Sequence, residues 1–177
     1  MKPLLSCLLA GCLVSPVYAQ ERNWTLEEFV QKLEEGQPWT KEKAEAQLGV
    51  KLAKISLTRY RAFGQFVYGE GLIVDRISYD IWEKTDEMRG IRANEMSDIG
   101  IGFDDKSSCF KQERIKKSYP GGDSDESYVR PGGSYVYYIN RGWGTVTFQF
   151  GDQRQYKCLT GIAISMNRII NIVEEPK

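Results

Sequence analysis

The stretch LIVDRISYDIW, Leu72–Trp82, alternates apolar and polar side chains and governs the fold that this sequence predicts. Ile73, Ile77, Tyr79 and Ile81 all fall at odd positions, and successive side chains of a strand point to opposite faces of a sheet. With its β-branched and aromatic residues, the stretch predicts a strand that buries one face. Two similar strands are expected before it, at 50–57 and 61–68, with a turn at Gly69-Glu70-Gly71.

The same period continues towards the C-terminus. Ile99, Ile101 and Phe103 indicate a fourth strand, whereas residues 84–98 leave strand and loop open. Five more strands are predicted at 134–140, 145–150, 153–159, 161–165 and 168–173, with turns at Arg141-Gly142, Gly151-Asp152 and Met166-Asn167. Residues 120–133 are rich in glycine and acidic residues and predict a flexible connection.

Helical signals interrupt the strands at three places. Thr25 and Glu28 form a capping-box pattern, Trp24 is placed to pack on Phe29, and Gly36 ends the helix. A second helix is expected from Thr40 to Gly49, and a third over 109–118, capped by Ser107 or Ser108. The predicted fold class is α+β, with short helices packed on an antiparallel sheet.

The two halves of the chain carry a similar pattern. Residues 40–49 and 111–120 superpose at an offset of 71, which aligns Ala44 with Ile115 and Leu48 with Tyr119. Two repeated α–β units, about 24–104 and 105–177, are therefore one interpretation of the sequence. This layout resembles exported tandem inhibitors of the β-lactamase-inhibitory-protein type. That resemblance implies helices on one sheet face and an enzyme bound to the other, and it assigns no binding residue.

The N-terminus predicts export. Lys2 precedes eleven mostly apolar residues, 4–14, and Val17-Tyr18-Ala19 resembles a signal-peptidase site. Cleavage there makes residues 1–19 a signal peptide and releases a single domain, 20–177, to the periplasm or the medium. The alternative is lipidation at Cys12, within Leu-Ala-Gly-Cys, which would anchor the domain to a membrane. No segment is apolar over the roughly 20 residues that a transmembrane span requires.

Two cysteines remain in the processed domain under either interpretation. Cys109 and Cys158 are expected to form a disulfide, because export leads to an oxidising compartment. The processed domain has a net charge of −1, since Lys2 is the only charged residue removed. A near-neutral balance predicts neither a nucleic-acid partner nor attraction to an anionic membrane.

The residue inventory argues against catalysis. The sequence has no histidine, which removes Ser-His-Asp and Cys-His mechanisms and histidine-based zinc sites. The carboxylate clusters of predicted loops that could act in catalysis are Asp104-Asp105 and Asp123, Asp125 and Glu126. We therefore expect a protein that is not an enzyme and needs no cofactor or metal. A carboxylate-dependent hydrolase remains the least favoured alternative.

The C-terminal strands are unusually aromatic, and aromatic side chains dominate binding hot spots. We expect a partner to contact Tyr135, Tyr137, Arg141 and Trp143, with Asp123, Asp125 and Glu126 at the rim. The predicted function is a protein-binding module of the bacterial envelope, as an inhibitor or immunity protein. The main alternative is a periplasmic carrier of a small ligand or glycan.

Overall fold

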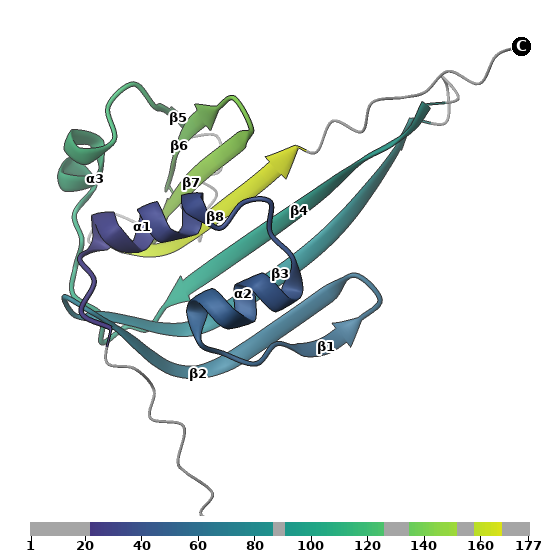
Figure 1. Cartoon of the computed structure of the whole chain (residues 1–177). Helices are drawn as coiled ribbons and strands as arrows, with labels where there is room; N and C mark the ends of the chain where they lie inside the picture. Colours follow the sequence, from purple (N-terminus) through teal and green to yellow (C-terminus); the bar gives the residue numbers. More distant parts are fainter. Residues whose placement is uncertain (1–21, 87–90, 126–134, 152–157, 168–177) are drawn as a thin grey trace, which may run out of the picture.

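The computed structural model describes residues 22–86, 91–125, 135–151 and 158–167. These residues form eight antiparallel strands in one sheet, in the order β1-β2-β3-β4-β8-β7-β6-β5, with three short helices (Figure 1). The predicted α+β class is confirmed. The strands are two consecutive meanders, β1–β4 and β5–β8, which meet where β4 pairs with β8.

The first meander is longer than the second. Its strands are β1 (Ala53–Ser56), β2 (Arg59–Gly69), β3 (Leu72–Asp86) and β4 (Ile91–Phe103). The second consists of β5 (Asp123–Asp125), β6 (Tyr135–Arg141), β7 (Gly144–Phe150) and β8 (Leu159–Asn167). Residues 84–86 and 91–98, which the sequence left open, belong to β3 and β4, and these strands extend past their other neighbours as a two-stranded ribbon (Figure 1).

The first two helices follow the local signals in the sequence. Helix α1 (Leu26–Glu35) has the predicted capping box: Thr25 Oγ1 accepts from the Glu28 N–H at 3.2 Å, and Glu28 Oε2 accepts from the Thr25 N–H at 2.8 Å. The Trp24 and Phe29 rings lie 6.1 Å apart, as the hydrophobic staple requires. Helix α2 (Lys41–Leu48) is capped by Thr40 and ends at Gly49, whose φ of 68° favours glycine.

The third helix begins later than predicted. Helix α3 spans Gln112–Ser118, and neither Ser107 nor Ser108 caps it, so that prediction is wrong. The Ser107 hydroxyl instead donates to the Ile73 carbonyl at 2.5 Å. Lys111 pairs with Cys158 as an isolated bridge, which keeps the chain before the helix extended.

A β-bulge corrects the predicted face of β3. The register with β4 shifts between Val74 and Arg76, so the buried side chains change from even to odd positions there. Val74 is buried before the bulge, and Ile77 and Tyr79 are buried after it. The expectation that Ile73 shares a face with Ile77 is therefore wrong.

The core lies between the sheet and the helices. Cross-strand pairing aligns the buried residues of six strands in rows. From β2 to β6 the two central rows are Tyr60, Tyr79, Ile99, Ile164, Val146 and Ile139, and Ala62, Ile77, Ile101, Ile162, Phe148 and Tyr137. Nearly all of these side chains are buried, together with Leu26, Phe29, Val30 and Leu33 of α1, in one hydrophobic cluster.

Two predicted features of the second half are wrong. Met166 and Asn167 lie within β8 instead of forming a turn. Part of the predicted flexible connection forms the edge strand β5. Of the strand expected at 153–159, residues 153–157 fall outside the described residues, Cys158 forms an isolated bridge and Leu159 begins β8. The strand expected at 168–173 lies entirely outside the described residues.

The two halves share some features of a repeat. Ala44 and Ile115, which the offset of 71 aligns, are both buried. Two helices precede the first meander, however, and one precedes the second. The repeated unit therefore stays a prediction.

Candidate functional site

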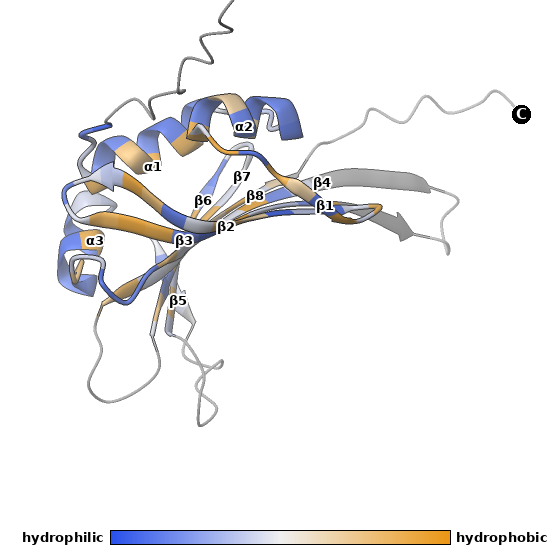
Figure 2. Cartoon of the chain, turned by 90° about the horizontal axis from the view of Figure 1, so that it is seen from below, coloured by the Kyte–Doolittle hydropathy of each residue, from blue (hydrophilic) through white to orange (hydrophobic). Residues whose placement is uncertain are grey.

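The eight-stranded sheet has one face without a helix among the described residues. Helices α1 and α2 lie together on one side of the sheet (Figure 2). Helix α3 belongs to that side too, because its flanking Tyr119 packs on Phe148 of the core with ring centroids 5.0 Å apart. We call the opposite side the open face.

The residues of the open face follow from the strand register. Each buried residue alternates with one that points to the other side of the sheet. From β2 to β6 the three rows are Arg59, Asp80, Asp98, Ser165, Thr145 and Asn140; Arg61, Ser78, Gly100, Ala163, Thr147 and Tyr138; and Phe63, Arg76, Gly102, Gly161, Gln149 and Val136.

The centre of the open face is formed mostly by small and hydroxylic residues, with one carboxylate, Asp98, between Asp80 and Ser165. We define the central patch as the small or hydroxylic open-face residues of β4, β7 and β8: Gly100, Gly102, Thr145, Thr147, Gly161, Ala163 and Ser165. In the three rows, Asp98 is the one charged residue contributed by β4, β7 or β8. Neighbouring side chains cover part of the glycine backbone: a Cβ at Gly102 would meet Asp75 Oδ1 at 2.9 Å and Arg76 Nη2 at 3.2 Å, and one at Gly161 would meet Gln149 Oε1 at 3.2 Å.

Charged residues lie to either side of the central patch. On the β2–β3 side, the Arg61 guanidinium donates two hydrogen bonds of 2.7 and 3.0 Å to the Asp80 carboxylate. The Arg61 side chain is 20% exposed and the Asp80 side chain 14% exposed. Arg59 and Arg76 are exposed on the same side, and Asp123 is exposed on the edge strand β5. A centre with few charged residues and a charged periphery is typical of a protein interface.

The predicted binding tyrosines lie on the helix-covered face. Tyr137 is 3% exposed, and its hydroxyl donates to the Tyr119 carbonyl at 2.5 Å. Tyr135 is half-buried and packs on Phe150 at 5.8 Å between ring centroids. The expectation that these two side chains form an exposed binding face is wrong, because the helices cover that side. Tyr138 is the aromatic residue of β6 that points to the open face.

Arg141 and Trp143 also belong to the helix side. Arg141 Nε donates to Glu34 Oε1 of α1 at 2.9 Å, so this guanidinium holds a helix against the sheet. Trp143 is partly buried and packs against the core. The structure thus brings the four predicted residues close to the helices and not to one exposed surface.

The acidic residues occupy the periphery. Asp123 and Asp125 belong to β5, where they pair with Tyr138 and Val136 of the open face. Glu126 lies outside the described residues. At the other acidic pair, a hydrogen bond from the Lys106 N–H is the main cause that lowers the pKa of Asp104. A general acid needs a raised pKa, so this environment does not suit Asp104 to that role.

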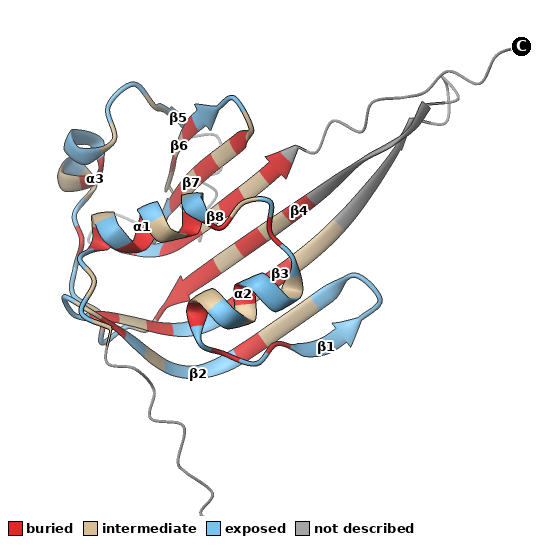
Figure 3. Ribbon diagram, in the orientation of Figure 1, coloured by how far each residue is buried: buried red, intermediate tan, exposed pale blue. Residues whose placement is uncertain are grey.

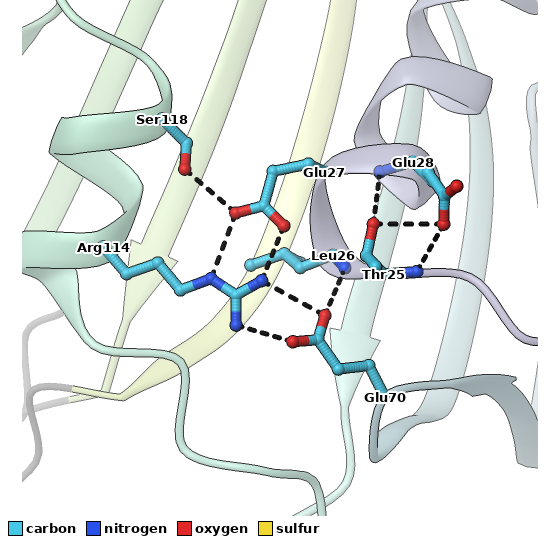
Figure 4. Close-up of polar contacts among 7 residues, drawn as sticks. All are labelled: Thr25, Leu26, Glu27, Glu28, Glu70, Arg114 and Ser118. Carbon is cyan, nitrogen blue, oxygen red and sulfur yellow. Dashed lines mark hydrogen bonds and ion pairs between the residues drawn. The ribbon is translucent and has the colours of Figure 1, made fainter.

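A cluster of ionic contacts joins the two halves at the N-terminus of α1 (Figure 4). Arg114 of α3 contacts Glu27 Oε2 of α1 at 2.6 Å and Glu70 Oε1 of the β2–β3 turn at 2.8 Å. Glu70 also accepts from the Leu26 N–H at 2.8 Å, and Ser118 donates to Glu27 at 2.9 Å. Hydrogen bonds from Arg114 are the largest cause that lowers the pKa of both glutamates.

Arg114→Met is expected to lower the free energy of unfolding by about 1–2 kcal/mol at pH 7, since two half-exposed ion pairs are lost. The pKa values of Glu27 and Glu70 are lowered in the folded state, so their contribution is complete above their ordinary pKa of 4.5 and is lost as the pH falls through the folded values. Urea unfolding at pH 7 and pH 3 should show the wild-type advantage shrinking at pH 3.

Arg141→Met is the matched control, because it removes one ion pair, to Glu34. Its effect should be smaller than that of Arg114→Met. The free energies of unfolding of wild type and Arg114→Met could differ as much at pH 3 as at pH 7. That result would show that the arginine acts through packing and not through the two carboxylates.

The predicted disulfide is confirmed. Cys109 and Cys158 are bonded, with their Cα atoms 4.8 Å apart. Among the residues described, no three acidic, cysteine or histidine side chains gather as a metal site would require. None of the described helices has the length and hydropathy needed to cross a bilayer.

Sequence reasoning missed the open face although a signal was present. Thr145-Val-Thr-Phe-Gln-Phe and Gly161-Ile-Ala-Ile-Ser-Met both alternate a small or polar residue with a large apolar one. Two adjacent strands with this pattern share one small-residue face. The concentration of aromatic residues directed the prediction to the buried face instead.

Comparison with protein families, with curated proteins and with solved structures found no match.

Proposed function

We propose that this chain is an exported, non-enzymatic module that binds a protein of the bacterial cell envelope through the open face of its sheet. An inhibitor or an immunity protein is the favoured kind. The observation that carries the proposal is the central patch of small and hydroxylic residues on a sheet face that no described helix covers. The disulfide supports export, because such bonds persist in oxidising compartments.

The geometry of the patch suits a protein partner. Adjacent strands lie about 4.8 Å apart, so β4, β8 and β7 together present a surface wide enough for a loop or a helix. The central patch provides the hydroxyl groups of Thr145, Thr147 and Ser165, which can exchange hydrogen bonds with a partner. The resemblance to exported inhibitors that bind through a sheet face is consistent with this arrangement.

Ala163→Arg is expected to weaken partner binding at least tenfold, which corresponds to about 1.4 kcal/mol. Ala163 lies at the middle of the central patch, between Gly100 and Thr147, and a guanidinium there would hold a partner away from the sheet. The measurement is capture from an envelope extract, followed by affinity determination with the protein that is recovered.

Ala46→Arg is the matched control. It makes the same substitution at an exposed position of α2, on the helix side of the molecule. Both variants should unfold at the wild-type urea concentration within error. Equal recovery of the same protein by Ala163→Arg, Ala46→Arg and wild type would exclude the open face as the binding surface.

A further inference from the structure

The exposed large apolar residues of the described chain gather on one hairpin. Ile55, Leu57, Phe63 and Val67 are 61%, 83%, 68% and 65% exposed, and all four belong to β1, β2 or the turn between them. Figure 3 shows this hairpin at the margin of the molecule, with its turn exposed. Nothing in the packing of the fold requires large apolar side chains at these positions.

The turn of this hairpin is unusual in its residues. Leu57 and Thr58 connect β1 to β2, whereas such turns ordinarily hold glycine, asparagine or aspartate. Ile55 is the extra residue of a bulge, since the register with β2 shifts between Lys54 and Ser56. The Ile81 N–H donates to the Thr58 carbonyl at 2.9 Å, so the turn is fixed to β3.

The hairpin that carries Ile55 and Leu57 is rich in basic residues. Residues 51–69 contain four lysines and arginines and no acidic residue, although the net charge of the chain is zero. Arg61 is neutralised by Asp80, and Lys51 is bonded to Glu45 at 3.3 Å while its side chain stays 91% exposed. Lys54 and Arg59 are exposed on either side of the turn. We define the hairpin tip as Lys54, Ile55, Leu57 and Arg59, because Lys51 precedes β1 at the end away from the turn.

We propose that the hairpin tip docks on an anionic phospholipid surface. Leu57 and Ile55 would enter the region between headgroups and acyl chains, while Lys54 and Arg59 face the lipid phosphates. A protein partner fits less well, because lysine is depleted in protein interfaces and Ile55 and Leu57 form a narrow strip on an edge strand and its turn instead of a broad patch. This docking goes beyond the proposed function and involves the β1–β2 hairpin, which shares Arg59 with the charged side of the open face.

The test is co-sedimentation of the purified protein with vesicles of phosphatidylethanolamine and phosphatidylglycerol, compared with phosphatidylcholine alone. Wild type should bind the anionic vesicles, and less at high salt. The double variant Ile55→Ser, Leu57→Ser should bind at least about tenfold more weakly, because it loses the apolar area that enters the lipid. Lys54→Gln with Arg59→Gln should also weaken binding about tenfold and flatten the salt dependence.

Phe63→Ser is the matched control. Phe63 is as exposed as Ile55 and lies on the same hairpin, but it points to the open face beside Arg76. It should bind vesicles as wild type does. Failure of wild type to bind anionic vesicles would overturn the proposal, and so would equal binding by the double variant. If wild type does not bind vesicles and the double variant Ile55→Ser, Leu57→Ser no longer captures a protein partner, the hairpin tip belongs to a protein interface instead.

Discussion

Replacing Cys109 and Cys158 together with serine is expected to lower the free energy of unfolding by about 4 kcal/mol. The bond closes a loop across a sequence separation of 49 residues, so its loss frees a large part of the unfolded chain. Typical domains are stable by only about 5–15 kcal/mol, so the variant should be folded but marginal. Urea unfolding, monitored by tryptophan fluorescence, measures the difference.

The expected loss has a local structural basis as well. The disulfide joins the segment before α3 to the start of β8, beside the hydrogen bond from the Leu159 N–H to the Phe110 carbonyl at 2.9 Å. Phe110 and Ile115 are buried in the same region and should keep α3 on the sheet. Reduction should destabilise wild type by the same amount and leave the serine variant unchanged. A loss below about 1 kcal/mol would contradict the prediction.

Local signals in the sequence were sufficient for the first helices. The capping box of Thr25 and Glu28 and the contact of Trp24 with Phe29 involve residues at most five positions apart. The residues that make these contacts are neighbours in the sequence, so the start of the helix could be predicted from the local pattern alone. The start of α3 could not be predicted in this way, because it depends on the pairing of Lys111 with Cys158, which are distant in sequence.

Strand alternation predicted which residues share a face but not which face is buried. Tyr135 and Tyr137 do lie on one side of β6 and Tyr138 on the other, as expected. All three are aromatic, so nothing in β6 alone distinguishes core from surface. The buried face is determined by contacts with Tyr119, whose carbonyl accepts a hydrogen bond from the Tyr137 hydroxyl and whose ring packs on Phe148. For β3, the bulge reversed the alternation at a position that no glycine marks.

Phe148→Ala is expected to lower the free energy of unfolding by about 3–5 kcal/mol. The Phe148 side chain is completely buried between the rings of Tyr119 and Tyr137, whose centroids lie 5.0 and 6.3 Å from its own. Removing it leaves a cavity where the sheet meets the chain after α3. Tyr119 would lose its main aromatic contact, and the Tyr137 hydroxyl would be held less firmly.

Thr147→Ala is the control, and it relates this experiment to the proposed function because Thr147 belongs to the open face. Thr147 is the preceding residue of β7 and points to the open face, where it pairs with Ala163 and Tyr138. Its loss should change stability by less than about 1 kcal/mol, because a surface substitution leaves no cavity. Urea unfolding of the two variants therefore measures the two faces of one strand. If Thr147→Ala were as destabilising as Phe148→Ala, the face assigned to partner binding would itself be part of a packed core, and the proposed interaction surface would have to be abandoned.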